Sequence, residues 1–191
     1  MAECDEEIKA GKVTVFMLDE CHLNWGNIIG YVWGKTNKRI KIDIENEKER
    51  QTYYGALDYG NKEFLMKEYS AGNTENTIDF LKYLQRERVG QRIVIIWDGA
   101  KYHYSKEIKE YLEKINGGKE EKEWQITCIK LAPNAPEQNP VEDIWLQGKN
   151  FIRKFYKYCE SFRDVKYLFK YFIEGEKFSF KKIFEYDFCH K

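Results

Sequence analysis

The chain has 191 residues, which is enough for one well-buried domain but too few for a second full domain. Hydrophobic residues make up 42% of it and charged residues 34%, proportions that are typical of a globular protein and exclude extended disorder. It has no apolar run of the length that crosses a membrane, about 18 residues, and its acidic N-terminus lacks the apolar segment of a secretory signal. Five scattered cysteines without a Cys-x-x-Cys pair favour reduced thiols, so we expect a cytoplasmic protein.

Charge is unevenly distributed along a chain whose formal net charge is zero. Residues 1–148 contain 21 Lys and Arg against 26 Asp and Glu, whereas residues 149–191 contain 11 against 6. The basic C-terminal segment is able to bind a polyanion if a cation neutralises the acidic side chains of the rest. A solvated basic helix explains the same pattern equally well.

The first half of the chain is rich in strand signals. Residues 13–18 form a short apolar run, which predicts a buried strand whose tip carries Asp19 and Glu20. Further strands are expected over residues 28–33, 39–44, 51–59 and 63–69, with a turn at Gly60 and Asn61 between the last two.

Helices and strands alternate in the second half. Residues 74–89 have the apolar spacing of a helix, with Val89 on its inner face, that ends at Gly90. Residues 92–97 are the most apolar run of the chain and predict a central strand, buried on both faces and followed by Asp98. Ser105 is a typical N-cap for a helix to about residue 115.

The last third begins with an expected strand over residues 125–131. All three prolines of the chain then fall between residues 133 and 140, which predicts a stiff loop. Asn139 and Pro140 open a long helix, because Pro is favoured at the first helical position. A helix over residues 162–173 and a strand over 177–184 are expected to follow.

This order of elements predicts an α/β fold around a mixed sheet, with early antiparallel strands and later parallel ones. We expect residues 1–159 to form the main domain, and residues 160–191 to form a helical, aromatic and basic extension that packs on it.

Two acids, Asp19 and Asp98, follow strands expected at the centre of this sheet, at the edge where α/β proteins form their sites. Glu137, Glu142 and Asp143 are the candidates for a third carboxylate from the long helix. At about 100° per residue, Asp143 points away from the apolar stripe into solvent, whereas Glu142 lies on its flank, which favours Glu142. A capping role is the alternative for Glu142, and strand-end turns are the alternative for both aspartates.

Three motifs resemble a known family. Leu18-Asp19-Glu20, Asp98-Gly99-Ala100 with His103, and Asn139-Pro140-Val141-Glu142 with Trp145 are similar to the catalytic region of bacterial insertion-sequence transposases. The branch is insertion sequence 630 of the mariner-like superfamily, whose members are DDE endonucleases. The similarity runs from about residue 13 to about residue 156.

The resemblance implies an RNase H-like fold with a five-stranded sheet, in which the first three strands are antiparallel and the last two are parallel. It also implies a triad of Asp19, Asp98 and Glu142 that holds two Mg²⁺ or Mn²⁺ ions. Such ions activate a nucleophile and stabilise the leaving oxygen of a phosphodiester. Asn139, Pro140 and Trp145 match the motif that opens the family's helix, and His103 matches its histidine, with DNA contact or buried packing as its two interpretations.

The chain departs from the family in three places. The 43 residues between Asp98 and Glu142 exceed the usual spacing, and the excess falls in the charged connection over residues 116–124. The helix-turn-helix region that binds transposon ends in the family has no counterpart, which indicates a truncation or a split reading frame. Residues 21–50 are long for a strand connection, and we expect a clamp-like insertion that contributes to a homodimer.

The function expected from the resemblance is cleavage of double-stranded DNA at transposon ends and strand transfer to target DNA, at the nucleoid. Contacts to DNA phosphates are expected from four cations on the long helix, with a plain solvated face as the alternative: Lys149, Arg153, Lys154 and Lys157. The rival functions are a general RNase H-like nuclease and a non-catalytic remnant that binds DNA or dimerises.

Overall fold

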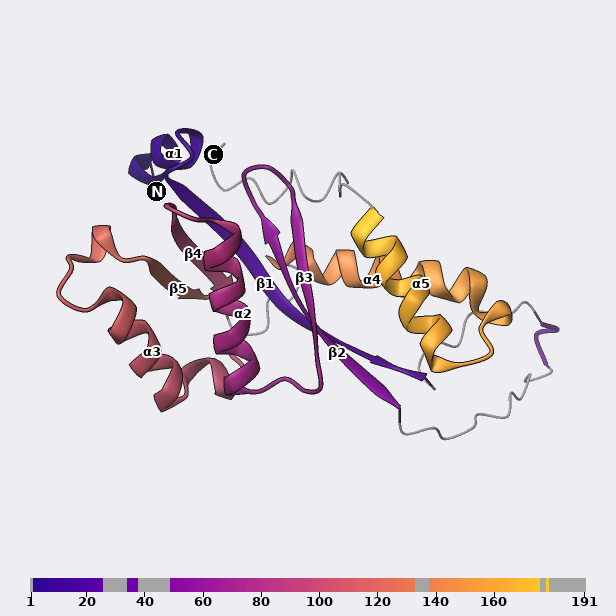
Figure 1. Ribbon diagram of the computed structural model, residues 1–191. Helices are drawn as coiled ribbons and strands as arrows, with labels where there is room; N and C mark the ends of the chain where they lie inside the picture. Colours follow the sequence, from indigo (N-terminus) through magenta and orange to yellow (C-terminus); the bar gives the residue numbers. More distant parts are fainter. Residues whose placement is uncertain (1, 26–33, 38–48, 133–137, 176–177, 179–191) are drawn as a thin grey trace.

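The computed structural model describes residues 2–25, 34–37, 49–132, 138–175 and 178. Its centre is a five-stranded mixed sheet with the strand order β3-β2-β1-β4-β5 (Figure 1). The strands are β1 (Val13–Asn24), β2 (Arg50–Asp58), β3 (Phe64–Tyr69), β4 (Arg92–Trp97) and β5 (Ile126–Lys130). β1, β2 and β3 pair in antiparallel fashion, whereas β1, β4 and β5 are parallel, which confirms the expected topology.

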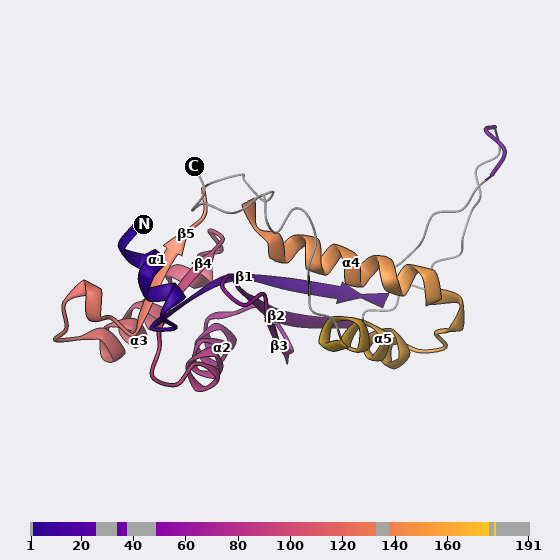
Figure 2. The ribbon, with the colours of Figure 1, turned by 90° about the horizontal axis from the view of Figure 1, so that it is seen from above.

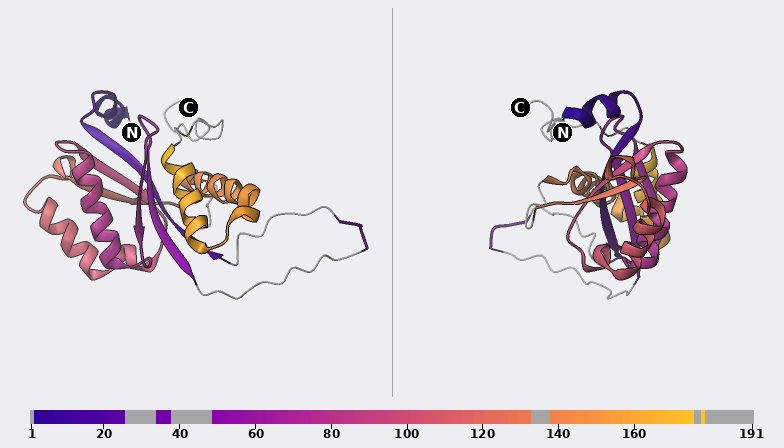
Figure 3. Two further views of the ribbon diagram at one scale, coloured as in Figure 1. Left: turned by 45° about the vertical axis from the view of Figure 1, so that its right-hand side comes forward. Right: turned by 90° about the vertical axis from the view of Figure 1, so that its left-hand side faces the viewer.

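The helices cover both faces of the sheet, as Figure 2 shows from above. They are α1 (Ala2–Lys9), α2 (Thr74–Glu87), α3 (Lys106–Asn116), α4 (Pro140–Phe155) and α5 (Phe162–Gly175). α2 and α3 lie on one side of the strands, and α4 and α5 lie on the other (Figure 3). Short 3₁₀ turns occupy connections in the described part of the chain: η2 (Lys101–Tyr104), η3 (Glu121–Glu123) and η5 (Tyr156–Tyr158).

Alternation of side chains along β1 divides the interior into two cores. Phe16 and Leu18 face α2 and α3, in a core that also contains Ile95 and Trp97 of β4. Met17 of β1 and Ile96 of β4, which alternate with these residues, face α4 and α5. The core on that side continues into α5 through residues such as Phe169. Among the described residues, no helix is both long enough and apolar enough to cross a membrane.

The long helix α4 begins where the sequence predicted. The side-chain oxygen of Asn139 accepts a hydrogen bond from the amide of Val141, and Pro140 occupies the first turn. Ser105 caps α3 in the same way, through the amide of Ile108. α5 confirms the helix expected over residues 162–173, while the division of the chain at residue 160 stays a prediction.

Four expectations from sequence differ from the structure. β1 continues to Asn24 instead of ending at Leu18, because β2 pairs with it along that whole length. Val89 is 83% exposed and not on an inner face, because α2 ends at Glu87 and helical phase no longer applies. One face of β4 is buried and the other only partly so, because alternate residues such as Val94 retain exposure. α1 was not expected at all, and the strands predicted over 28–33, 39–44 and 177–184 lie outside the described residues.

Candidate active site

Asp19 and Asp98 lie side by side where β4 ends. The parallel register pairs Met17 of β1 with Ile96 of β4, so two further residues along both strands place Asp19 opposite Asp98. β1 runs on beyond this point with β2 as its strand partner. Asp19 is therefore inside a strand, yet it borders the open edge left by the end of β4, where a ligand can reach it.

Glu142 enters the same region from the first turn of α4. Asn139 fixes this turn, because its Nδ2 donates a buried hydrogen bond of 3.0 Å to the carbonyl of Leu18, the residue before Asp19. The ring of Trp145 packs over Gly55, which pairs with Asp19 across β1 and β2. A Cβ at Gly55 would lie 2.5 Å from Cζ2 of Trp145, so only glycine allows α4 to approach this closely.

Exposure of the adjacent acids on α4 differs from the expectation. Glu142 is exposed, whereas Asp143 is half-buried and does not point freely into solvent. Helical phase predicted that Asp143 points into solvent, because it takes account of the sheet alone and of no other neighbour of the helix. The preference for Glu142 therefore rests on its charge, which acts on Asp19.

Several acids repel one another around Asp19. Burial, followed by the charges of Glu20 and Glu142 and, more weakly, Asp98, raises the pKa of Asp19 well above its ordinary value. Burial and the neighbouring acids therefore both disfavour the charged form of Asp19. Carboxylate oxygens are also the ligands that Mg²⁺ and Mn²⁺ prefer, so the residues fit a divalent cation.

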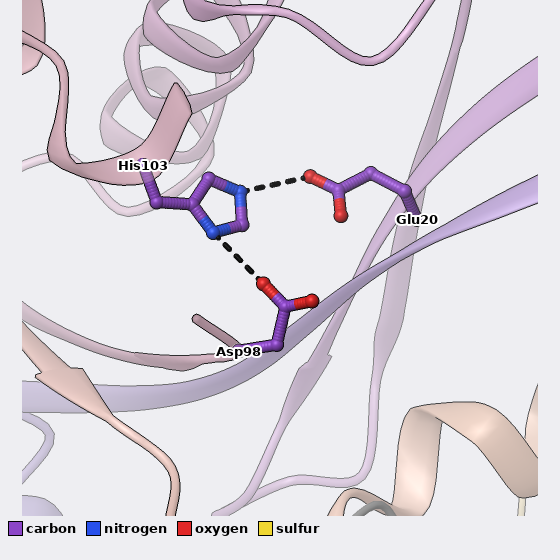
Figure 4. Close-up of side chains that lie close together, drawn as sticks. All are labelled: Glu20, Asp98 and His103. Carbon is purple, nitrogen blue, oxygen red and sulfur yellow. Dashed lines mark hydrogen bonds and ion pairs between the residues drawn. The ribbon is translucent and has the colours of Figure 1, made fainter. Parts of the chain in front are cut away.

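His103 connects two of these acids, as Figure 4 shows. Its Nδ1 lies 3.0 Å from Oδ1 of Asp98, and its Nε2 lies 3.0 Å from Oε1 of Glu20. The ring stacks on Trp97 at a centroid distance of 4.3 Å and an interplanar angle of 4°. His103 is buried with both nitrogens facing carboxylates, which corresponds to the packed interpretation from the sequence; contact with DNA stays a prediction.

Charge is shared within this cluster. Burial opposes the charge on His103, but hydrogen bonds to Asp98 and Glu20 outweigh it and raise the pKa of the imidazole to about 9. The bond from His103 lowers the pKa of Asp98, and the amide of Ala100, which donates to Oδ1 at 2.9 Å, lowers it further. Asp98 is therefore ionised, while Asp19 beside it resists ionisation until a cation arrives.

The four cations expected on the long helix do not share one environment, and Lys157 lies beyond α4 in η5. Lys149 is half-buried, and its charge acts on the thiol of Cys21 of β1, two residues beyond Asp19. Arg153 is half-buried and donates to Asn150 at 2.7 Å. Lys154, at the end of α4, and Lys157, in η5, are exposed. DNA contact by any of these residues stays a prediction.

Sequence reasoning missed the roles of two residues at the site, Glu20 and Lys130. Glu20, considered only as a competitor of Asp19, is the hydrogen-bond partner of His103. The side chain of Lys130, at the end of β5, packs against Gly99. Its charge lowers the pKa of Asp98. The one signal for Glu20 was its alternation with Asp19, which places consecutive acids on opposite faces of a strand.

A mixed five-stranded sheet with carboxylates at the end of its central parallel strands defines the RNase H-like class of fold. The family model for DDE superfamily endonucleases matches residues 14–166, most of the chain, and the protein belongs to this family. No curated protein sequence matches the chain.

Solved structures agree with this fold. The Mos1 transposase in its paired-end complex with the left transposon end has a TM-score of 0.61 at 14% identity, covering 97% of this chain and 57% of that one. The Mos1 transposase catalytic domain with raltegravir and Mn has a TM-score of 0.57 at 12% identity, with 97% and 86% covered. A chain of the simian T-cell lymphotropic virus intasome, in complex with PP2A regulatory subunit B56 gamma, has a TM-score of 0.52 at 12% identity, with 82% and 47% covered.

Identities this low establish the fold alone. The chain spans about half the length of the intasome chain and of the paired-end transposase, 47% and 57%.

Proposed function

We propose that the protein is a transposase catalytic domain, which cleaves DNA strands and transfers them to target DNA. The proposal is supported by the strand register, which sets Asp19 of β1 beside Asp98 after β4, and by the charges of Glu142 and Asp98, which act on Asp19. Family membership as a DDE endonuclease supports strand cleavage, and the transposase structures support DNA as the substrate.

The alternation along β1 supports Asp19 over Glu20 as the metal ligand from this strand. Asp19 shares its face with Met17 and Cys21, which pack toward α4, the helix that carries Glu142. Glu20 points to the opposite face and is engaged by His103. We therefore assign Asp19, Asp98 and Glu142 to the metal and leave Glu20 outside that set.

We propose two Mg²⁺ or Mn²⁺ ions per site, because the three carboxylates offer more oxygens than one ion needs from protein. When bound, such ions activate an attacking oxygen and stabilise the leaving oxygen of a phosphodiester. The residues supply the orientation: Asn139 holds α4 against Leu18, and His103 with Ala100 holds Asp98.

Contacts to DNA are proposed for cations around this edge. Lys130 lies beside Asp98. Lys149 of α4 lies beside Cys21, two residues beyond Asp19 on β1, so both cations are close enough to the site to bind phosphates near the cut. Arg153 and Lys154 extend this cationic surface to the end of α4, and Lys157 extends it into η5. Recognition of transposon ends by a separate helix-turn-helix region, a homodimer and a clamp within residues 21–50 all stay predictions.

Nicking of supercoiled plasmid in Mn²⁺ tests the proposed cleavage. Asp98→Asn and Glu142→Gln should each reduce nicking by about 100-fold or more, because each removes a ligand charge from the metal site. Glu68→Gln, on β3 in an ion pair with Lys170, is the matched control and should cleave like the wild type. Full nicking by either active-site variant would sink the assignment.

Strand transfer separates a transposase from the rival functions. An oligonucleotide with a free 3′-hydroxyl should become joined to plasmid in the presence of Mn²⁺. Cleavage without joining, or cleavage restricted to RNA–DNA hybrids, would favour a general nuclease. Binding of DNA with neither reaction would favour a non-catalytic remnant.

A further inference from the structure

We infer that Glu20 is a positioning residue of the metal site: it holds His103, and His103 in turn fixes the carboxylate of Asp98. This inference deepens the proposed function and rests on it, because Asp98 matters as a metal ligand. Glu20 lies next to Asp19 in the sequence, yet it acts on the other catalytic aspartate, 78 residues away along the chain.

Both donors to Asp98 contact the same oxygen. Nδ1 of His103 lies 3.0 Å from Oδ1, and the amide of Ala100 donates to Oδ1 at 2.9 Å. The second oxygen of Asp98 is outside this pair of contacts, which leaves it for a ligand (Figure 4). An aspartate at the end of a strand rotates freely about two side-chain bonds, so these contacts select one orientation.

The ring of His103 is held by contacts with Trp97, Tyr102 and Glu20. Trp97 stacks on its face, and the ring of Tyr102 meets its edge at a centroid distance of 4.7 Å. Nε2 makes a hydrogen bond of 3.0 Å with Oε1 of Glu20, so rotating the ring would break this bond and the ion pair of Nδ1 with Asp98 together. The His103 side chain is 1% exposed and that of Glu20 5% exposed, so water has little access to replace either bond.

Glu20 is itself anchored. Its backbone is fixed in β1 by pairing with Tyr54 of β2, and burial, together with the charge of Glu20, raises the pKa of the neighbouring Tyr102 hydroxyl. The chain of contacts therefore runs from a rigid strand through one carboxylate and one imidazole to Asp98. A network of this kind fixes a metal ligand in the way that outer partners of ligating residues do, and loss of such a partner costs about 10- to 100-fold in metal affinity.

The same three side chains allow a rival interpretation, in which they hold a metal ion themselves. One ligand atom from each of Glu20, Asp98 and His103 lies within 4.8 Å of the others. The two ring nitrogens, however, face different carboxylates, so an ion on Nε2 would displace the hydrogen bond to Glu20 and an ion on Nδ1 would displace the ion pair with Asp98. The positioning role keeps both bonds, and the two interpretations predict different results in a double-mutant cycle.

The test is the affinity of the whole chain for Mn²⁺ without DNA, measured by electron paramagnetic resonance. Glu20→Ala and His103→Ala should each weaken binding by about tenfold, and the double variant should bind no more weakly than His103→Ala. Glu68→Ala is the control and should bind like the wild type. Glu20→Gln keeps an acceptor oxygen for Nε2 and should retain more affinity than Glu20→Ala.

Thermal unfolding of each metal-free variant shows whether it is folded, and Glu20→Gln replaces Glu20→Ala in the cycle if the alanine variant is not. Losses that multiply in the double variant would show that Glu20 acts on the ion independently of His103 and would overturn the inference. Unchanged affinity in Glu20→Ala, with a wild type that binds Mn²⁺, would overturn the inference alone. A wild type that binds no Mn²⁺ would overturn the proposed function together with it.

Discussion

Replacing Asn139 by Ala removes two hydrogen bonds with different tasks. The side-chain oxygen caps α4 through the amide of Val141 at 3.2 Å, and Nδ2 ties the helix to the carbonyl of Leu18 at 3.0 Å. Asn139 is 3% exposed, so water does not substitute for either bond without local opening. The residue therefore joins the element that carries Glu142 to the strand that carries Asp19.

The two losses are of known size. Removing an N-cap side chain costs about 0.5–2 kcal/mol. Leaving the buried carbonyl of Leu18 without its donor costs about 1–3 kcal/mol more. We expect Asn139→Ala to lower the free energy of unfolding by about 2–4 kcal/mol, with the lower value if the helix end relaxes to admit water.

Urea unfolding measures this effect, with Asn73→Ala as the matched control. Asn73 caps α2 through the amide of Asn76, at 2.9 Å, and removal of that cap alone should cost about 1 kcal/mol. The excess in Asn139→Ala over the control isolates the bond to Leu18. An equal loss in the two variants would refute a tether between α4 and β1, and so would plasmid nicking at the wild-type rate by folded Asn139→Ala.

Two further predictions concern the support of the site and of the sheet. Gly55→Ala should destabilise the protein by about 1–3 kcal/mol and slow nicking, because the new methyl overlaps the ring of Trp145; unchanged urea unfolding would contradict the close packing. A hydrogen bond from Lys67, aided by Tyr69, lowers the pKa of Asp79 below its ordinary 3.8, so its stabilising effect is present above about pH 4 and is lost as the pH falls through the folded-state pKa. The difference in unfolding free energy between wild type and Asp79→Asn should therefore shrink below pH 4, and a constant difference would contradict the assignment.

Local patterns were sufficient to predict the sheet and the helix starts. Apolar runs located four strands within a residue or two, and the caps Asn139 and Ser105 act over a few residues of chain. The end of β1 was misplaced because Asp19 and Glu20 look like a strand terminus. Their charges are tolerated inside the strand because β4 ends beside Asp19 and His103 meets Glu20, both of which are long-range facts.

The candidate site was predictable in its residue types and less so in its contacts. The motif placed His103 near Asp98, only five residues away, but its second partner is 83 residues distant and no local pattern announces it. Helical phase separated Glu142 from Asp143 but gave the wrong exposure for Asp143, because the phase reports a direction and not what lies there. Gly55 carries no signal in the sequence, since its role depends on the ring of Trp145 packing from another element.

The most direct test is a crystal structure of the protein grown or soaked with Mn²⁺, with the ion located by its anomalous scattering. We expect Mn²⁺ bound by carboxylate oxygens of Asp19 and Asp98, with Glu142 beside it and with His103 still bonded to Glu20. An ion bound instead by Glu20 and His103, or no ion at saturating Mn²⁺, would contradict the assignment of the three carboxylates.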